Sequence, residues 1–234
     1  MTNNDNNISL KKTARIAGFL YLLLAPTAFF GLKYIPSLTI PGDSVTTVKN
    51  IMNNTLLFQL SILCALITPL LTLFVSQYLY KIFKSINKDQ ATLMVIFTLI
   101  ATPIAMLSEI SHFAVLQLLN NSYYVNNMGV DQIHPQIMLF LDLGRYGGYI
   151  AAIFWGFWLL PLGYLILKSN YIPKFIGILM IVAGFGYIID SLIVFFSQNL
   201  NTTISSYTFI GEVVLLLWLL IKGVNVPTSN MNRT

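Results

Sequence analysis

The stretch LLFQLSILCALITPLLTLFVSQYLY, residues 56–80, contains no charged side chain along its whole length. At about 1.5 Å per residue, a helix of this length exceeds the roughly 30 Å of hydrocarbon in a bilayer. A strand of a membrane barrel would instead alternate polar and apolar residues over about ten positions, which this stretch does not do. It therefore predicts a helix that spans a membrane.

Similar apolar stretches recur along the chain. Those long enough to cross a membrane lie at 14–33, 56–80, 91–119, 138–167, 171–197 and 205–222. The composition agrees, because 56% of the 234 residues are hydrophobic and only 9% are charged, whereas soluble domains contain about 25% charged residues. We therefore expect an all-α polytopic membrane bundle of six transmembrane helices. They form a single domain at 13–223, between a disordered cytoplasmic tail at 1–12 and a cytoplasmic tail at 224–234.

The basic residues are distributed unevenly over the expected loops. On a six-helix path, ten of the 13 lie on one side, only Lys33 and Lys49 lie on the other, and Arg145 lies within a span. Basic loops stay in the cytoplasm, so both termini are expected there. The basic residues that give the chain its net charge of +5 are then explained as markers of the cytoplasmic side. A nucleic-acid partner is not expected, because it would need basic residues clustered on a folded surface.

Small and hydroxylated side chains recur every three or four residues on three of the spans, which places them on one face of each helix. The three sets are Ser61, Ala65, Thr68, Thr72 and Ser76; Thr98, Thr102, Ala105, Glu109 and His112; and Gly144, Gly148, Ala152 and Gly156. Small residues let helix backbones approach closely. We therefore expect these faces to meet inside the bundle.

Two outer loops carry further local predictions. In the loop 34–55, Asp43 follows Pro41-Gly42 and is expected to cap a short interfacial helix that runs to Asn53. The loop 120–137 is polar and aromatic, and either a solvated loop or a lid fits it.

Six ionisable side chains lie inside or at the edge of the apolar runs, where a charge costs about 2.5–3.5 kcal/mol or more unless it is paired or hydrated. They are Glu109, His112, Asp142, Arg145, Asp190 and Glu212. Counting about 1.5 Å per residue from the outer helix ends places all of them in the outer half of the bilayer. We therefore expect them to converge on one site, with Asp142 and Arg145 paired one helical turn apart.

The four carboxylates of this group outnumber Arg145, its one permanent cation. The guanidinium can bond two carboxylates in a forked geometry, and His112 can add at most one positive charge. Desolvation and like-charge repulsion act on the remaining carboxylates. The excess of acidic groups therefore predicts a site that holds a proton or a cation.

Three functions remain open for this site. It holds a proton, a cation or a small polar ligand in a transport-like or sensing protein; it belongs to an intramembrane enzyme acting on a lipid or isoprenoid; or it is only a helix clamp in a structural subunit. No cofactor or metal is expected, because Glu109 and His112 form one Glu-x-x-His pair where di-metal bundles use two. Cys64 is the single cysteine, which excludes an intrachain disulfide and a thiolate zinc cluster.

The stretch GFWLLPLGYLILKSNYIPKFIG at 156–177 continues through AGFGYIID at 183–190. With ARIAGFLY at 14–21, PGD at 41–43 and GEVVLLLWLLIKG at 211–223, it resembles the domain-of-unknown-function 4386 family of bacterial multi-pass membrane proteins. The resemblance covers nearly the whole chain and implies a six-span protein of the cell membrane. It brings no catalytic residues with it and leaves the function open.

Overall fold

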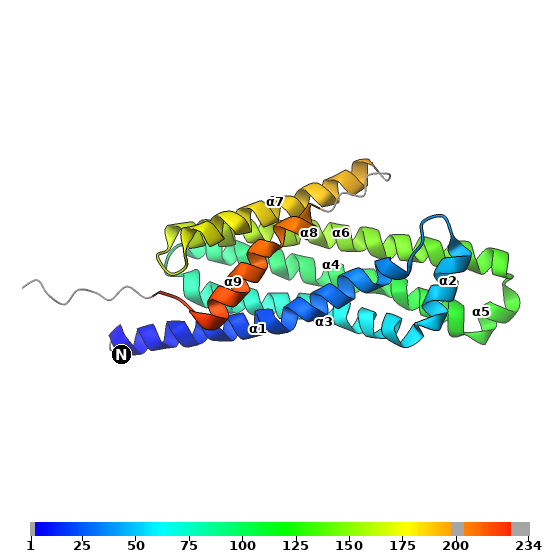
Figure 1. Ribbon diagram of the computed structural model, residues 1–234, viewed down its shortest axis with the longest axis horizontal. Helices are drawn as coiled ribbons and strands as arrows, with labels where there is room; N and C mark the ends of the chain where they lie inside the picture. Colours follow the sequence, from blue (N-terminus) through cyan, green and yellow to red (C-terminus); the bar gives the residue numbers. More distant parts are fainter. Residues whose placement is uncertain (1–2, 198–203, 226–234) are drawn as a thin grey trace, which may run out of the picture. The chain divides into compact units, whose positions relative to one another are not determined.

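The computed structural model describes residues 3–197 and 204–225, which fold into α-helices joined by short connections (Figure 1). The helices are α1 (Asn3–Leu38), α2 (Ser44–Asn53), α3 (Thr55–Phe83), α4 (Lys88–Asn120), α5 (Ser122–Asn127), α6 (Val130–Lys168), α7 (Lys174–Phe196), α8 (Ser205–Thr208) and α9 (Ile210–Ile221). Five of them, α1, α3, α4, α6 and α7, are long and apolar enough to span a membrane. The chain is thus an all-α membrane helix bundle, and a lipid bilayer is its environment.

The sixth expected span, 205–222, is shorter than the other five. It consists of α8 and α9, joined through Phe209, and its apolar segment is Ser205–Ile221. At about 1.5 Å per residue this segment reaches about 25 Å, a little less than the hydrocarbon thickness. A complete crossing by this segment therefore stays a prediction.

Two helices begin earlier than expected. Residues 3–12, for which we expected a disordered tail, form the start of α1. A helix that is already nucleated by a long apolar span extends through polar residues at little cost, because their helix propensities are only modestly lower than that of alanine. Part of the expected loop 120–137 is likewise helical, as α5 and the first turns of α6. Of the expected C-terminal tail, residues 226–234 lie outside the described residues.

The expected single domain divides into two compact units. Unit 1 comprises Met1–Leu23, Leu71–Ile100 and Ala152–Thr234, and unit 2 comprises Leu24–Leu70 and Ala101–Ala151. The boundary between the units cuts through four helices, so that each unit contains one part of α1, α3, α4 and α6.

In unit 1, α9 lies between α1 and α7 (Figure 1). A Cβ added at Gly18 of α1 would lie 2.6 Å from the backbone nitrogen of Leu220, and one added at Gly211 of α9 would lie 2.8 Å from Cβ of Leu179 in α7. These separations leave no room for larger side chains. Glycines on α1 and α9 therefore let α9 approach its two neighbours closely.

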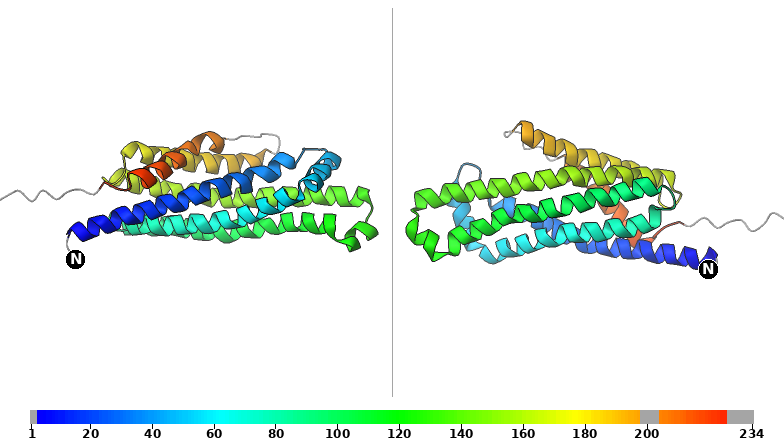
Figure 2. Two further views of the ribbon diagram at one scale, coloured as in Figure 1. Left: turned by 60° about the horizontal axis from the view of Figure 1, so that its bottom comes forward. Right: turned by 180° about the vertical axis from the view of Figure 1, so that it is seen from behind.

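In unit 2, an apolar core joins five helices. It is built from Ile35, Leu38, Val48, Ile51, Phe58, Ile62, Val115, Leu118, Ile133, Ile137 and Leu141. The short helices α2 and α5 lie at the same end of this unit (Figure 2). The amphipathic α2 is held there by Val48 and Ile51, whose burial removes apolar surface from contact with water at the end of the bundle.

Two of the three expected small-residue faces are confirmed. Every member of the sets on α3 (Ser61 to Ser76) and α4 (Thr98 to His112) is buried. The set on α6 is only partly correct, because a Cβ at Gly148 would meet nothing within 4 Å, whereas Gly147 lies against Ser108. A spacing of four residues exceeds the 3.6 residues of one turn, so such a stripe drifts around the helix.

The cap of α2 is also confirmed. The carboxylate of Asp43 accepts hydrogen bonds from the backbone N–H of Thr46 at 2.9 Å and from its hydroxyl at 2.6 Å. Gly42 has a φ of 77°, a left-handed conformation that glycine adopts without strain and that turns the chain into the helix.

Replacing Asp43 with alanine is expected to loosen α2, because the first turn loses both of these hydrogen bonds. The measurement is hydrogen exchange of the α2 amides, which should become faster while amides at the centre of α4 stay protected. Asp43→Asn is the matched control, since its amide oxygen can still accept from Thr46. Equal exchange in the wild type and in Asp43→Ala would refute the cap.

The same cap predicts a pH dependence. Hydrogen bonds from the side chain and backbone of Thr46 hold the pKa of Asp43 below its usual value. Because the folded state has the lower pKa, the stabilisation of α2 is complete above the unfolded-state pKa of about 3.9. It is lost as the pH falls through the folded-state pKa, so exchange in α2 should become faster there.

Candidate functional site

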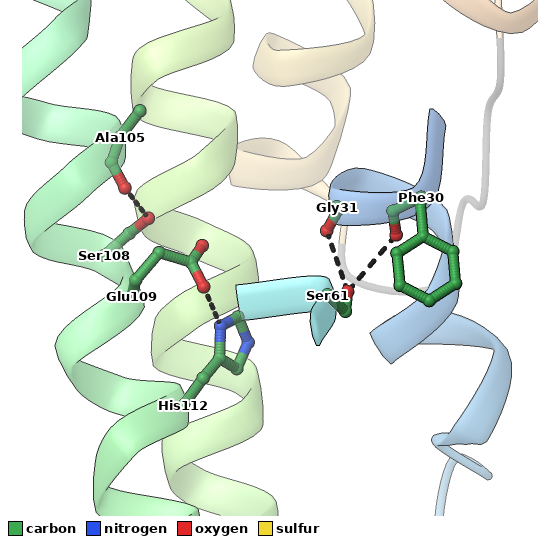
Figure 3. Close-up of polar contacts among 7 residues, drawn as sticks. All are labelled: Phe30, Gly31, Ser61, Ala105, Ser108, Glu109 and His112. Carbon is green, nitrogen blue, oxygen red and sulfur yellow. Dashed lines mark hydrogen bonds and ion pairs between the residues drawn. The ribbon is translucent and has the colours of Figure 1, made fainter. Parts of the chain in front are cut away.

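Glu109 and His112 form a buried pair on consecutive turns of α4, in unit 2. Nδ1 of His112 lies 2.8 Å from Oε2 of Glu109, and their side chains are only 10% and 8% exposed, respectively. Figure 3 shows the two side chains pointing toward each other along one helix. The hydrogen bond therefore lies within α4 and does not join α4 to another helix.

Neighbouring helices fix the His112 imidazole in place. On α6, a Cβ added at Gly144 would lie 2.6 Å from Nε2 of His112, so only glycine leaves space for the ring. On α3, the Phe58 ring meets the imidazole edge to face, with 6.1 Å between the ring centres. Gly147 and Ser108 bring α6 and α4 together one turn away. The packing thus orients the imidazole toward Glu109.

Asp142 and Arg145 form a second pair in unit 2, on α6. Nη2 of Arg145 lies 3.0 Å from Oδ1 of Asp142, which confirms the expected pairing one helical turn apart. These side chains are 42% and 49% exposed, and the guanidinium carbon lies 5.2 Å from the centre of the Tyr146 ring. Asp142 neutralises Arg145 locally, and the pair is much more accessible than that of Glu109 and His112.

Glu212 on α9, in unit 1, accepts hydrogen bonds from two tyrosines. The hydroxyl of Tyr21 on α1 donates to Oε2 at 3.1 Å, and the hydroxyl of Tyr187 on α7 donates to Oε1 at 2.9 Å. This carboxylate therefore ties three helices together. Sequence analysis missed both tyrosines, although a phenol inside an apolar span signals a need for an acceptor.

Asp190 on α7 caps the helix that follows it along the chain. Its Oδ1 accepts from the backbone N–H of Ile204 at 3.0 Å, and its Oδ2 accepts from that of Ser205 at 2.7 Å. A helix start leaves such N–H groups without partners and favours a negative charge. Asp190 is buried, so these hydrogen bonds also satisfy a carboxylate that is removed from water.

The six predicted site residues thus form four polar groups. Unit 2 holds two pairs, each within one helix, and unit 1 holds two carboxylates that receive neutral donors from other segments. Convergence of all six on Arg145 stays a prediction. Within residues 3–197 and 204–225, no three side chains of His, Cys, Asp or Glu gather to form a metal site.

Comparisons with known proteins point to one family. The family described as "Domain of unknown function (DUF4386)" matches residues 16–223 of this chain. A relative from the archaeon Archaeoglobus fulgidus, described as "Uncharacterized protein", is 46% identical over 83 residues, which cover 36% of this chain. The aligned part spans about half of that relative, 46% of its length. No solved structure matches the chain.

Proposed function

This chain belongs to the family described as domain of unknown function (DUF4386), whose description gives no activity. We therefore propose a function from the site itself: the protein binds and releases a proton at Glu109 and His112. It does so as a multi-pass protein of the cell membrane with both termini in the cytoplasm. The proton serves either transport or the sensing of pH. The burial of a hydrogen-bonded Glu and His on a single helix carries this proposal.

The alternative of a helix clamp does not fit this pair. Polar groups in membrane bundles stabilise packing when they form hydrogen bonds between helices. Glu109 and His112 bond to each other within α4, so their bond adds nothing to the contact of α4 with α3 or α6. A buried pair that costs desolvation without joining helices favours a functional role over a structural one.

The surroundings of the pair make its net charge depend on a single proton. With His112 protonated and Glu109 ionised the pair is neutral, and without that proton it carries one negative charge. On the packed part of α3, residues 55–70, no side chain is charged and Cys64 is the one titratable group. On α6, Asp142 and Arg145 flank Gly144 along the chain and neutralise each other. Proton exchange therefore changes the net charge of this region by one unit.

The clamp fits the unit 1 carboxylates better. Glu212 receives hydroxyls from α1 and α7, and Asp190 receives two backbone N–H groups at the start of α8. Each carboxylate accepts one hydrogen bond on each of its two oxygens, and both residues connect separate helices. We therefore assign a structural role to Glu212 and Asp190. This assignment leaves unit 2 as the place of proton exchange.

An infrared pH titration of the purified chain in lipid nanodiscs tests the proton site. The wild type should show one step in which the carboxylate bands of Glu109 shift as the pair gains its proton. Both Glu109→Gln and His112→Gln should remove this step, because the first variant lacks the carboxylate and the second lacks the imidazole. Asp142→Asn is the matched control, since it changes a carboxylate in the other pair of the same spacing. A titration step that persists in both α4 variants would exclude this site.

A second measurement separates transport from sensing. Wild-type protein in vesicles that contain a trapped pH indicator should acidify or alkalinise the lumen if the proton crosses the membrane. A protein that titrates in the infrared measurement but passes no protons would be a sensor. Vesicles with Glu109→Gln provide the reference for proton leakage, because that variant keeps a hydrogen-bond acceptor beside His112.

A further inference from the structure

The start of α1 presents one face on which cations and apolar side chains are mixed. An open hollow of about 450 Å³ runs along it, lined by Ile8, Lys11, Lys12, Arg15, Ile16 and Phe19. All three cations are exposed, and so are Ile8 and Phe19, at 62% and 53%. Lys11, Lys12 and Arg15 form no ion pair with any carboxylate of residues 3–197 and 204–225.

Other parts of unit 1 bring further basic residues to the same end. Gly223 lies beside the start of α1, because a Cβ added there would lie 3.6 Å from the carbonyl oxygen of Lys11. The backbone N–H of Asn225 donates to the carbonyl of Tyr171 at 2.8 Å, and the Tyr171 ring lies 6.5 Å from that of Phe83. The ends of α1, α3, α6, α7 and α9 therefore meet here. They carry Lys11, Lys12, Arg15, Lys81, Lys84, Lys168, Lys174 and Lys222.

We propose that this hollow binds the headgroup of an anionic phospholipid and directs one of its acyl chains along α1. Lys11 and Lys12 supply positive charge to the phosphate, and Arg15 can grip two of its oxygens in a forked geometry. Ile16 and Phe19 follow Arg15 toward the interior of the apolar span, where an acyl chain runs. The ligand that matches this face must be negative at one end and apolar at the other.

This combination distinguishes a phospholipid from other anions. Free phosphate would use the cations and leave the exposed Ile8 and Phe19 unmatched. The surrounding lysines add a positive potential that attracts anionic lipids from the adjacent leaflet and falls off within a Debye length. Anionic lipid is also supplied by the bilayer in which the protein resides. The site is independent of the proton pair, which lies in unit 2.

Native mass spectrometry of the full-length chain tests the proposal. Protein in neutral detergent is mixed with equal amounts of phosphatidylglycerol and phosphatidylcholine, and the retained lipids are counted. The wild type should retain phosphatidylglycerol preferentially, and Lys11→Gln, Lys12→Gln and Arg15→Gln combined should lower that preference roughly tenfold or more. Lys33→Gln combined with Lys49→Gln is the matched control in unit 2 and should leave it unchanged.

Three results would overturn the proposal. The first is an unchanged preference in the triple variant. The second is full competition by inorganic phosphate at equal concentration, which would define a simple anion site. The third is loss of the preference in the unit 2 control. Arg15→Gln alone removes one cation and keeps the test decisive if the triple variant misfolds. It should lower the preference for phosphatidylglycerol roughly fivefold. No decrease in this variant would count against the site.

Discussion

Replacing Gly184 with alanine is expected to destabilise the protein by about 1–3 kcal/mol. The added Cβ would lie 2.8 Å from the carbonyl oxygen of Gly156, so the backbones of α6 and α7 would have to separate. The corresponding change on α6, Gly156→Ala, would place its Cβ 2.6 Å from the carbonyl oxygen of Gly184. It should lower the free energy of unfolding by at least as much. Unfolding of the purified protein in mixed detergent micelles, followed by circular dichroism, measures both effects.

Gly148→Ala is the matched control on α6. A Cβ at this position meets no atom within 4 Å. Alanine is favoured over glycine inside a helix by about 0.5–1 kcal/mol, so this variant should be as stable as the wild type or slightly more stable. If Gly184→Ala and Gly148→Ala unfold at the same fraction of denaturing detergent in the micelles, α6 and α7 do not pack through Gly156 and Gly184.

The sequence predicts best those features that depend on neighbouring residues. The apolar run at 56–80 needs only its length and composition to indicate α3, and the buried faces of α3 and α4 follow from the helical period. The cap of α2 depends on Asp43 and Thr46, three residues apart. The pair of Asp142 and Arg145 has the same spacing. Each of these predictions holds because the geometry of one helix determines it.

Interactions between segments that lie far apart in the chain could not be predicted from the sequence. Tyr21 lies 191 positions from Glu212, so no helical period connects them. Counting residues gives the depth of each carboxylate in the membrane, but depth does not determine which way a side chain points around its helix. This is why Glu212 and Asp190 were expected near Arg145, whereas hydroxyls and backbone N–H groups of unit 1 are the donors that the structure gives them.

The failure of the stripe on α6 has a related cause. Glycines four residues apart indicate that one face can pack closely, but they do not tell which glycine meets a partner. Gly144 faces the imidazole of His112, whereas Gly148 faces open space. The contact of Gly144 with His112 is part of the proposed proton site, and it joins two helices that no helical period connects.

Replacing Glu212 with leucine is expected to destabilise the protein by about 1–3 kcal/mol. The change removes the acceptor that both Tyr21 and Tyr187 use, and it leaves their two hydroxyls without that partner. Hydrogen bonds to charged groups contribute about 1.5–3 kcal/mol each in water-soluble proteins, whereas those measured between membrane helices average about 0.6 kcal/mol. For two hydrogen bonds the membrane estimate sums to about 1.2 kcal/mol and the lower soluble estimate to about 3 kcal/mol, and these two sums set the expected range. The same detergent unfolding measures the loss.

A double-mutant cycle decides whether Glu212 acts as the clamp between α1, α7 and α9. If it does, Tyr187→Phe should cost stability in the wild type and almost nothing in Glu212→Leu, because the bond is already absent there. The stability of Glu212→Gln should lie between those of the wild type and Glu212→Leu. Its amide oxygen still accepts from a tyrosine, although the negative charge is gone. If Glu212→Gln is as stable as the wild type but removes the infrared titration step, Glu212 would be the group that exchanges the proton, and the assignment of Glu109 and His112 would be wrong.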